Sequence, residues 1–299
     1  MEFNDSGNSL NGFFAVDKPP GFTSFDVVAK LRGILKTKKI GHGGTLDPMA
    51  TGVLPIFLGK ATKAADLTPD QSKTYIASAR FGIKTDTGDV TGNIIESNEI
   101  IPDKKSLSLA IASFAGKTEQ LPPMYSAVRI EGKRLYEFAR EGMTVERKPR
   151  EIEIYSIELL KYDKKEKVFG FEVHCSKGSY IRTLSEDIAK AAGALASLSA
   201  LRRIKSGLID ERECLKLPDV EEMASKGDFR FIKPIEQVFS VYRGIELSIK
   251  QEKDFLNGIR ISRFPGSQDG DRLRVYGKSG FLALADISDG KIISAARFV

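Results

Sequence analysis

One short run of the sequence combines an acid, an imidazole and several glycines, and these residue types could form a reaction centre. Residues 41–52 read GHGGTLDPMATG, in which His42 and Asp47 are the groups able to do chemistry. Glycine permits positive φ and close approach of the backbone to a ligand, and Pro48 drives Asp47 out of the α region. The run therefore predicts an irregular loop, neither helix nor strand, that aims one carboxylate at a substrate.

Three further segments accompany this loop. Residues 16–21 read VDKPPG, residues 122–127 read PPMYSA, and residues 178–184 read GSYIRTL. Together with residues 41–62 they resemble the bacterial tRNA pseudouridine-55 synthases, the TruB family, and they occur in the family's order. The resemblance implies the pseudouridine synthase fold and isomerisation of the T-loop uridine at position 55 of tRNA, on a base flipped out of its stack.

The resemblance assigns three residues to the catalytic machinery. Asp47 is the catalytic carboxylate, Arg182 lies against it, and Tyr75 is an active-site tyrosine. Desolvation in a closed pocket raises the pKa of a carboxylate, and a nearby guanidinium opposes that shift. Three roles stay open for the carboxylate: attack on C6 of the base, attack on C1′ of the ribose, or abstraction of a sugar proton.

Four more residues are assigned to substrate binding. His42 is expected to fill the space that the flipped base leaves, and Tyr180 to stack on the base or hydrogen-bond to it. Lys18 either supports the loop or contacts phosphate, and Leu201 forms an apolar pocket wall. Without the resemblance, core packing would account for the tyrosines and a surface position for Arg182.

The loop must be positioned by regular elements, and the sequence predicts an α+β protein with a mixed, largely antiparallel sheet. The helix at residues 24–35 has a capping box formed by Thr23 and Asp26. The helix at residues 180–192 has Ile181, Leu184, Ile188 and Ala191 as its buried stripe. The remaining expected elements are strands at residues 13–16, 75–81, 151–160 and 168–175, a buried apolar segment at residues 53–59, and a helix at residues 106–114.

Three domains are expected along the chain. Residues 1–11 form a polar N-terminal extension, and residues 12–240 form the catalytic domain. Residues 241–299 combine a helix near 247–258 with short strands near 273–276, 281–287 and 292–298, which predicts a small β-barrel. The resemblance makes this barrel a PUA-like RNA-binding domain, and a stabilising cap without RNA contact is the alternative.

Composition favours a polyanionic partner. The 299 residues carry a formal net charge of +6, with a pI near 9.1. Basic residues gather just before the glycine loop and again at residues 202–205, and such clusters favour nucleic acid over a purely solvated face. The first cluster consists of Lys30, Arg32, Lys36, Lys38 and Lys39.

The same composition restricts the cofactors and the compartment. Two cysteines and two histidines provide neither a disulfide framework nor the spacing of a metal site. The reaction is redox-neutral, so we expect no metal and no cofactor. No apolar stretch approaches the ~20 residues of a membrane span. We therefore expect a cytoplasmic protein, and the resemblance implies a monomer that binds the T-arm of tRNA.

Two alternatives remain. A guide-RNA-dependent synthase of the dyskerin type shares the Asp loop and the C-terminal module, although the segments at residues 122–127 and 135–140 favour the stand-alone form. A tRNA-binding or folding factor with incidental isomerase activity is the rival from another class.

Overall fold

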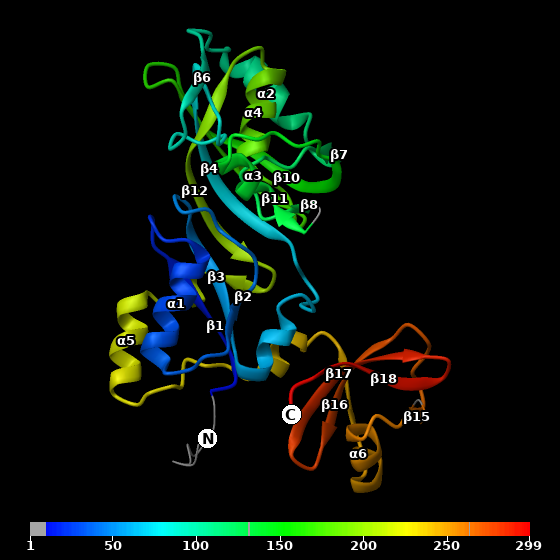
Figure 1. The fold of residues 1–299 in the computed structure, drawn as a ribbon. Coiled ribbons are helices and arrows are strands. Elements are labelled where there is room, and N and C mark those ends of the chain that lie inside the picture. The colour runs from blue at the N-terminus through cyan, green and yellow to red at the C-terminus, as the bar shows by residue number, and fades with distance from the viewer. Residues whose placement is uncertain (1–9, 131, 263) are drawn as a thin grey trace. The chain divides into compact units, whose positions relative to one another are not determined.

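The computed structural model describes residues 10–130, 132–262 and 264–299 (Figure 1). The expected N-terminal extension therefore lies outside the described residues, except for residues 10 and 11. The chain forms two units. The first consists of Met1–Pro48, Val53–Asp70 and Gly207–Val299, and the second of Met49–Gly52 and Gln71–Ser206.

The first unit contains the N-terminal strands and helices that carry the glycine loop. Strands β1 and β2 pair with β3, whose side chains from Gly52 onward are all buried. Helix α1 covers this part of the core together with α5. The elements are β1 Gly12–Lys18, α1 Ser24–Leu35, β2 Ile40–His42, β3 Thr51–Leu58, η1 Gly59–Ala64, β13 Ile209–Asp210, η2 Glu211–Glu213, α5 Leu217–Ser225 and η3 Ile235–Phe239.

Helix α1 begins where its sequence predicts. The Thr23 hydroxyl accepts the Asp26 backbone N–H at 3.0 Å, and the Asp26 carboxylate accepts the Thr23 backbone N–H at 2.8 Å. The Thr23 hydroxyl also donates to the Asp26 carboxylate at 2.7 Å, and this bond, together with the one from the Thr23 backbone N–H, lowers the pKa of Asp26. The two bonds from backbone N–H groups satisfy donors that the first turn of a helix leaves unpaired, so the predicted capping box is confirmed.

The C-terminal part of the first unit is a five-stranded sheet with one helix. The strand order is β14-β16-β17-β18-β15, and all pairs are antiparallel except β14 with β16. Phe298 packs on Phe239 and Phe281, with ring centroids 5.7 and 5.4 Å away, which joins the sheet to η3. The elements are β14 Arg243–Glu246, α6 Ile249–Leu256, β15 Ile261–Ser262, β16 Arg272–Gly277, β17 Gly280–Ser288 and β18 Lys291–Arg297.

The second unit is built on antiparallel strands in the order β12-β4-β11-β10-β7, and the first residues of β3 add a parallel pairing to β12. Helices α2 and α4 contact each other and the sheet. The predicted α+β fold with a mixed, largely antiparallel sheet is thus confirmed. The elements are β4 Lys73–Phe81, β5 Ile83–Thr85, β6 Ile94–Ser97, α2 Lys104–Ala112, β7 Gly116–Gln120, β8 Arg129–Ile130, β9 Lys133–Arg134, α3 Leu135–Arg140, β10 Arg150–Asp163, β11 Val168–Cys175, α4 Ile181–Ala191 and β12 Ala196–Ser206.

Several local predictions are wrong. His42 belongs to β2, because it pairs with Ile56 across to β3, so the irregular loop is shorter than expected. In α4, Ala191 is exposed and Ala189 is buried in its place. The basic run at residues 202–205 lies on β12, where Arg203 is only 1% exposed. Arg203 therefore does not belong to a basic surface.

Candidate active site

The backbone before Asp47 is anchored to the first turn of α1. The Ser24 hydroxyl accepts the Leu46 backbone N–H at 2.8 Å and lies 3.2 Å from the Leu46 carbonyl, to which it donates. Ser24 is 1% exposed, so water does not compete for these bonds. The residue that precedes the aspartate is consequently held at both of its backbone polar groups.

The backbone after Asp47 is anchored to β1 and the turn that follows it. The carbonyl of Pro48 accepts the Gly21 backbone N–H at 2.8 Å and the Lys18 ammonium at 3.2 Å. Lys18 is 0% exposed, and its ammonium also donates to the carbonyls of Pro19 and Phe22. The half-buried Asp47 therefore lies between two fixed neighbours, and its carboxylate is positioned by the loop.

The start of the loop packs tightly on β3. The Gly43 N–H donates to the Pro55 carbonyl at 2.9 Å. A Cβ atom on Gly43 would lie 3.0 Å from the Phe57 ring and 3.2 Å from the Pro55 side chain, so only glycine fits without a shift of its neighbours. His42 precedes this glycine and is half-buried at the end of β2.

Arg182 is a buried residue of the second unit, at the start of α4. Its side chain is held by two carbonyls, since one Nη donates to the Thr87 carbonyl at 2.8 Å and the other to the Tyr125 carbonyl at 2.8 Å. One turn later, burial raises the pKa of Glu186, although the charges of Lys84 and Arg182 oppose that shift. A guanidinium fixed in this way has a defined direction and can stabilise an anion.

Tyr75 and Leu201 lie on adjacent strands of the second unit. Both side chains are 7% exposed, and Leu201 pairs with Ala77, the residue two positions after Tyr75 on β4. Alternate residues of a strand face the same side of the sheet, so Tyr75 and Leu201 belong to one face. Tyr180 is half-buried at the N-cap of α4, and its backbone is hydrogen-bonded to the side chain of Gln120.

The expected site residues thus fall into two groups. The structure brings Lys18 into contact with the residue next to the aspartate, and it places Tyr75 beside the strand of Leu201. Asp47, His42 and Lys18 belong to the first unit, and Arg182, Tyr75, Tyr180 and Leu201 belong to the second.

Sequence reasoning missed the supports of these residues. Ser24 belongs to the family resemblance, through the pair Thr23-Ser24 that follows VDKPPG, but its contact with Leu46 was not predicted; a hydroxyl at the first position of a helix is a usable signal for such a backbone contact. No sequence pattern indicated that Gln120 or the carbonyls of Thr87 and Tyr125 would contact the site residues. Their contacts join positions 57 to 95 residues apart, which no local pattern encodes.

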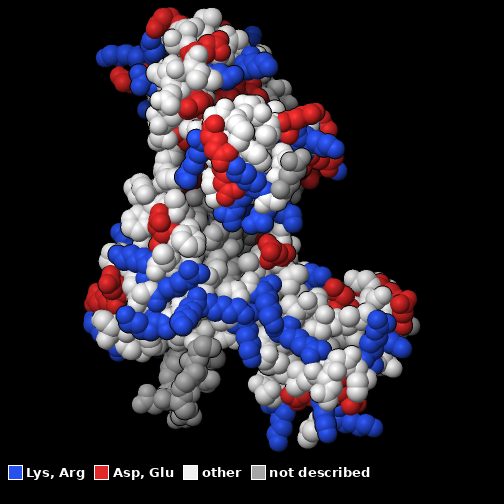
Figure 2. Space-filling model, viewed as in Figure 1, with Lys and Arg blue, Asp and Glu red and all other residues white. Residues whose placement is uncertain are grey.

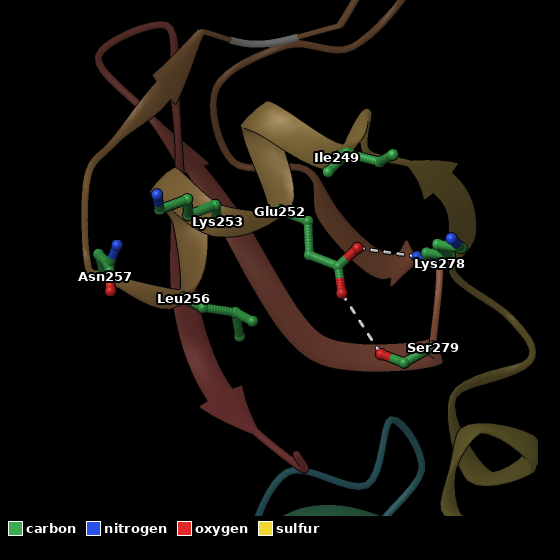
Figure 3. A pocket seen from close by; sticks show the side chains of 7 residues that line it. All are labelled: Ile249, Glu252, Lys253, Leu256, Asn257, Lys278 and Ser279. Atoms are coloured by element: carbon green, nitrogen blue, oxygen red, sulfur yellow. Dashed lines mark hydrogen bonds between the residues drawn. The ribbon is translucent and has the colours of Figure 1, made fainter.

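A hollow lies on the C-terminal sheet, beside α6 (Figure 3). Its central acid is Glu252, whose carboxylate accepts the Lys278 backbone N–H at 2.8 Å and the Ser279 hydroxyl at 3.3 Å. Both carboxylate oxygens hold the turn between β16 and β17. The Glu252 carboxylate therefore stabilises the turn. We do not consider this hollow a candidate reaction centre.

Exposed basic side chains gather over α1, β2 and η1 of the first unit (Figure 2). Of these, Lys30 is 3.8 Å from the carboxylate of Glu221, an exposed pair. Lys36 ends α1 in a left-handed conformation, with φ of 49°, which turns the chain toward β2. The exposed set, called here the basic surface, is Lys30, Arg32, Lys36, Lys38, Lys39, Lys60 and Lys63.

No group of three or more His, Cys, Asp or Glu side chains within residues 10–130, 132–262 and 264–299 is arranged to hold a metal ion. Within the same ranges, every helix is too short or too polar to span a bilayer.

Comparison with known proteins places the chain among the pseudouridine synthases. The family model for the N-terminal domain of TruB family pseudouridylate synthases matches residues 32–181. The model for the C-terminal domain of tRNA pseudouridylate synthase B matches residues 182–240. The chain therefore belongs to the TruB family.

Individual relatives agree with this assignment. The tRNA pseudouridine synthase B of Oceanobacillus iheyensis is 43% identical over 256 residues, which cover 85% of this chain and 84% of the relative. That of Francisella philomiragia is 40% identical over 292 residues, 97% of this chain and 95% of the relative. Among solved structures, the crystal structure of a Cbf5-Nop10-Gar1 complex matches with a TM-score of 0.72 and 26% identity, over 96% of this chain and 85% of that chain.

Proposed function

We propose that this protein is a stand-alone tRNA pseudouridine synthase that isomerises the T-loop uridine at position 55. The observation that carries the proposal is Asp47, held on a glycine loop between two anchored neighbours in a chain of the TruB family. The relatives that span nearly the whole chain are named tRNA pseudouridine synthase B, which favours tRNA without a guide RNA.

The reaction breaks the bond between C1′ and N1, turns the uracil, and forms a bond between C1′ and C5. The C5 proton is lost and N1 gains one, so atoms and electrons balance with neither an oxidant nor a reductant. An ionised carboxylate suits the role of nucleophile or base beside the sugar and the pyrimidine. We assign this role to Asp47, and we assign its electrostatic support to Arg182.

The other candidate residues then have the following roles. Tyr75 and Tyr180 offer ring faces and phenol groups to the displaced base, and Leu201 forms an apolar wall. His42 occupies the space that the flipped base leaves. Lys18 supports the loop, because its buried ammonium contacts backbone carbonyls.

The basic surface supports RNA as the partner, because exposed lysines neutralise phosphates and release counterions on binding. We propose that the T-arm of tRNA binds there and that residues 241–299 act as a PUA-like RNA-binding domain. We further propose a cytoplasmic monomer, with which the reduced thiols of Cys175 and Cys214 are consistent. Burial raises the pKa of Cys175 to about 11, so its thiol stays protonated and unreactive.

The test is tritium release from unmodified tRNA that carries [5-³H]uridine, for the native protein and for Asp47→Asn. We expect release by the native protein alone, with the product mapped to the T-loop, and equal tRNA binding by both. Arg182→Lys keeps the charge but loses the two-carbonyl geometry, so we expect a folded variant with strongly reduced turnover.

Two results would refute parts of the proposal. Tight tRNA binding without release by the native protein would point to a guide-dependent enzyme or a binding factor. Release by Asp47→Asn at the native rate would remove the carboxylate from the mechanism.

A further inference from the structure

The side chain of Gln120 links the end of β7 to the start of α4, 60 residues further along the chain. Its amide oxygen accepts the Tyr180 backbone N–H at 2.7 Å, and its amide nitrogen donates to the Tyr180 carbonyl at 3.0 Å. The backbone N–H requires an acceptor and the carbonyl requires a donor, so these partners fix the orientation of the amide. One side chain thus holds both backbone polar groups of one candidate site residue.

The start of α4 depends on this contact, because it has no cap of its own. Tyr180 is the N-cap residue, and its side chain makes no capping hydrogen bond, unlike the Ser, Thr, Asp or Asn that usually occupies this position. The chain approaches it through Gly178, whose φ is 84° and whose Cβ, if it had one, would meet no neighbouring atom within 4 Å. The backbone at Gly178 is thus not held by packing. The hydrogen bonds from Gln120 at the end of β7 restrain the backbone of Tyr180 two residues later.

The same stretch of chain also holds Arg182. Gln120 is followed by Leu121, two prolines and Met124, and then by Tyr125, whose carbonyl accepts the Arg182 guanidinium at 2.8 Å. The prolines restrict the backbone between the two contacts. Residues 120–125 therefore hydrogen-bond to both Tyr180 and Arg182. We expect a displacement of the backbone at Gln120 to move both of these candidate site residues.

The buried position of Gln120 argues for a role beyond packing. The residue is 4% exposed, and burying an amide has a desolvation cost that an apolar side chain of equal length avoids. That cost is offset only where both ends of the amide are hydrogen-bonded, as they are here.

We propose that Gln120 is a positioning residue for the isomerisation. It fixes the direction of Tyr180, and with Tyr125 that of Arg182, relative to the substrate base. The inference rests on the proposed function. Catalytic geometry tolerates little displacement, and an error of about 1 Å costs on the order of 100-fold in rate.

The decisive variants are Gln120→Met and Gln120→Glu. Methionine keeps the length of the side chain and removes both hydrogen bonds, whereas glutamate keeps an acceptor for the Tyr180 N–H. Tyr162→Phe is the matched control, because it removes one side-chain hydrogen bond to a carbonyl, that of Pro102 at 2.7 Å, elsewhere in the second unit.

Three quantities are measured at a temperature where every variant is fully folded: kcat for tritium release at saturating tRNA, the Kd for tRNA, and amide hydrogen exchange of a peptide covering residues 178–184. For Gln120→Met we expect kcat to fall by about 10-fold to 100-fold, and for Gln120→Glu by less. We expect the Kd to stay within about 2-fold, since phosphate contacts dominate affinity. Exchange should accelerate in residues 178–184 and not in α1, and Tyr162→Phe should change none of the three.

The outcomes separate this inference from the function on which it rests. Gln120→Met with native kcat despite faster exchange at residues 178–184 would overturn the positioning role. Faster exchange across the whole second unit, with a native kcat and a lower free energy of unfolding, would assign Gln120 to stability alone. A native protein without isomerase activity would refute the proposed function, while the exchange experiment would still report whether Gln120 fixes Tyr180.

Discussion

Substitution of Gly52 by alanine tests how closely two strands of the second unit approach each other. Gly52 pairs in parallel with Arg203 and has a φ of 100°. A methyl group there would lie 2.1 Å from the Arg203 carbonyl oxygen, 2.9 Å from its carbonyl carbon and 3.0 Å from its nitrogen. All three atoms are backbone, so no rotation of a side chain can relieve the contact.

The expected loss can be worked out from three contributions. Holding alanine at this φ costs about 1–3 kcal/mol, and forcing a methyl group into a filled space costs a further ~1–3 kcal/mol. Alanine also lowers the conformational entropy of the unfolded chain, and this effect stabilises the folded state by about 0.4–1 kcal/mol. We therefore expect Gly52→Ala to lower the free energy of unfolding by about 1–6 kcal/mol.

Gly116→Ala is a close control for the strain contribution. Gly116 lies in the same unit with a φ of 98°, and a methyl group there would have no neighbouring atom within 4 Å. This variant carries the backbone strain without the collision. The difference between the two variants isolates the collision, at about 1–3 kcal/mol.

The assay is urea unfolding of the native protein and both variants, compared over the same transition because both positions belong to the second unit. Gly52→Ala should have the lower midpoint with an unchanged slope. Equal midpoints for the two variants would show that β3 and β12 separate at little cost, and the close approach would then contribute nothing to stability.

Three further predictions concern affinity, packing and pH. Lys38→Ala should weaken tRNA binding and reduce the slope of log K against log salt by about 0.7–0.9, as measured by filter binding. Phe298→Ala should lower the free energy of unfolding by about 3–5 kcal/mol in thermal or urea unfolding, since the ring is 4% exposed. Glu186 has a raised pKa, so its ionisation destabilises the folded state and stability falls as pH rises past about 4.5. Glu186→Gln should therefore be more stable than the native protein at pH 7, with the difference vanishing below about pH 4 in urea midpoints.

The elements with a strong periodic pattern could be predicted from the sequence. Helix α1 has both its apolar stripe and its capping box in one short segment, and β4 alternates buried and exposed residues as expected. The strands predicted at residues 151–160 and 168–175 are observed as β10 and β11, which pair antiparallel. In each case the information is local, because the side chains that decide the element lie within one or two turns of each other.

Strand β12 could not be predicted, and neither could the supports of the site. Three of the last five residues of β12 are Arg202, Arg203 and Lys205. These charged residues indicate an exposed segment, so the sequence does not predict a strand inside the sheet. The burial of Arg203 depends on β3 and β4 lying on either side of it. Contacts of this kind are decided by the sheet as a whole, and a single segment does not contain them.

The buried cations show why a motif alone does not define this site. Lys18 and Arg182 are both nearly inaccessible to solvent, and both donate to backbone carbonyls of loops, at Pro48 in one case and at Thr87 and Tyr125 in the other. Burying such a charge is unfavourable unless its hydrogen bonds are made, so each loop conformation and its cation stabilise each other. A substitution in either loop that moves a carbonyl should therefore perturb the cation, although the motif residue itself is unchanged. The roles that a sequence pattern assigns to Asp47 and Arg182 consequently depend on residues such as Ser24 and Gln120, which hold the backbone that carries them.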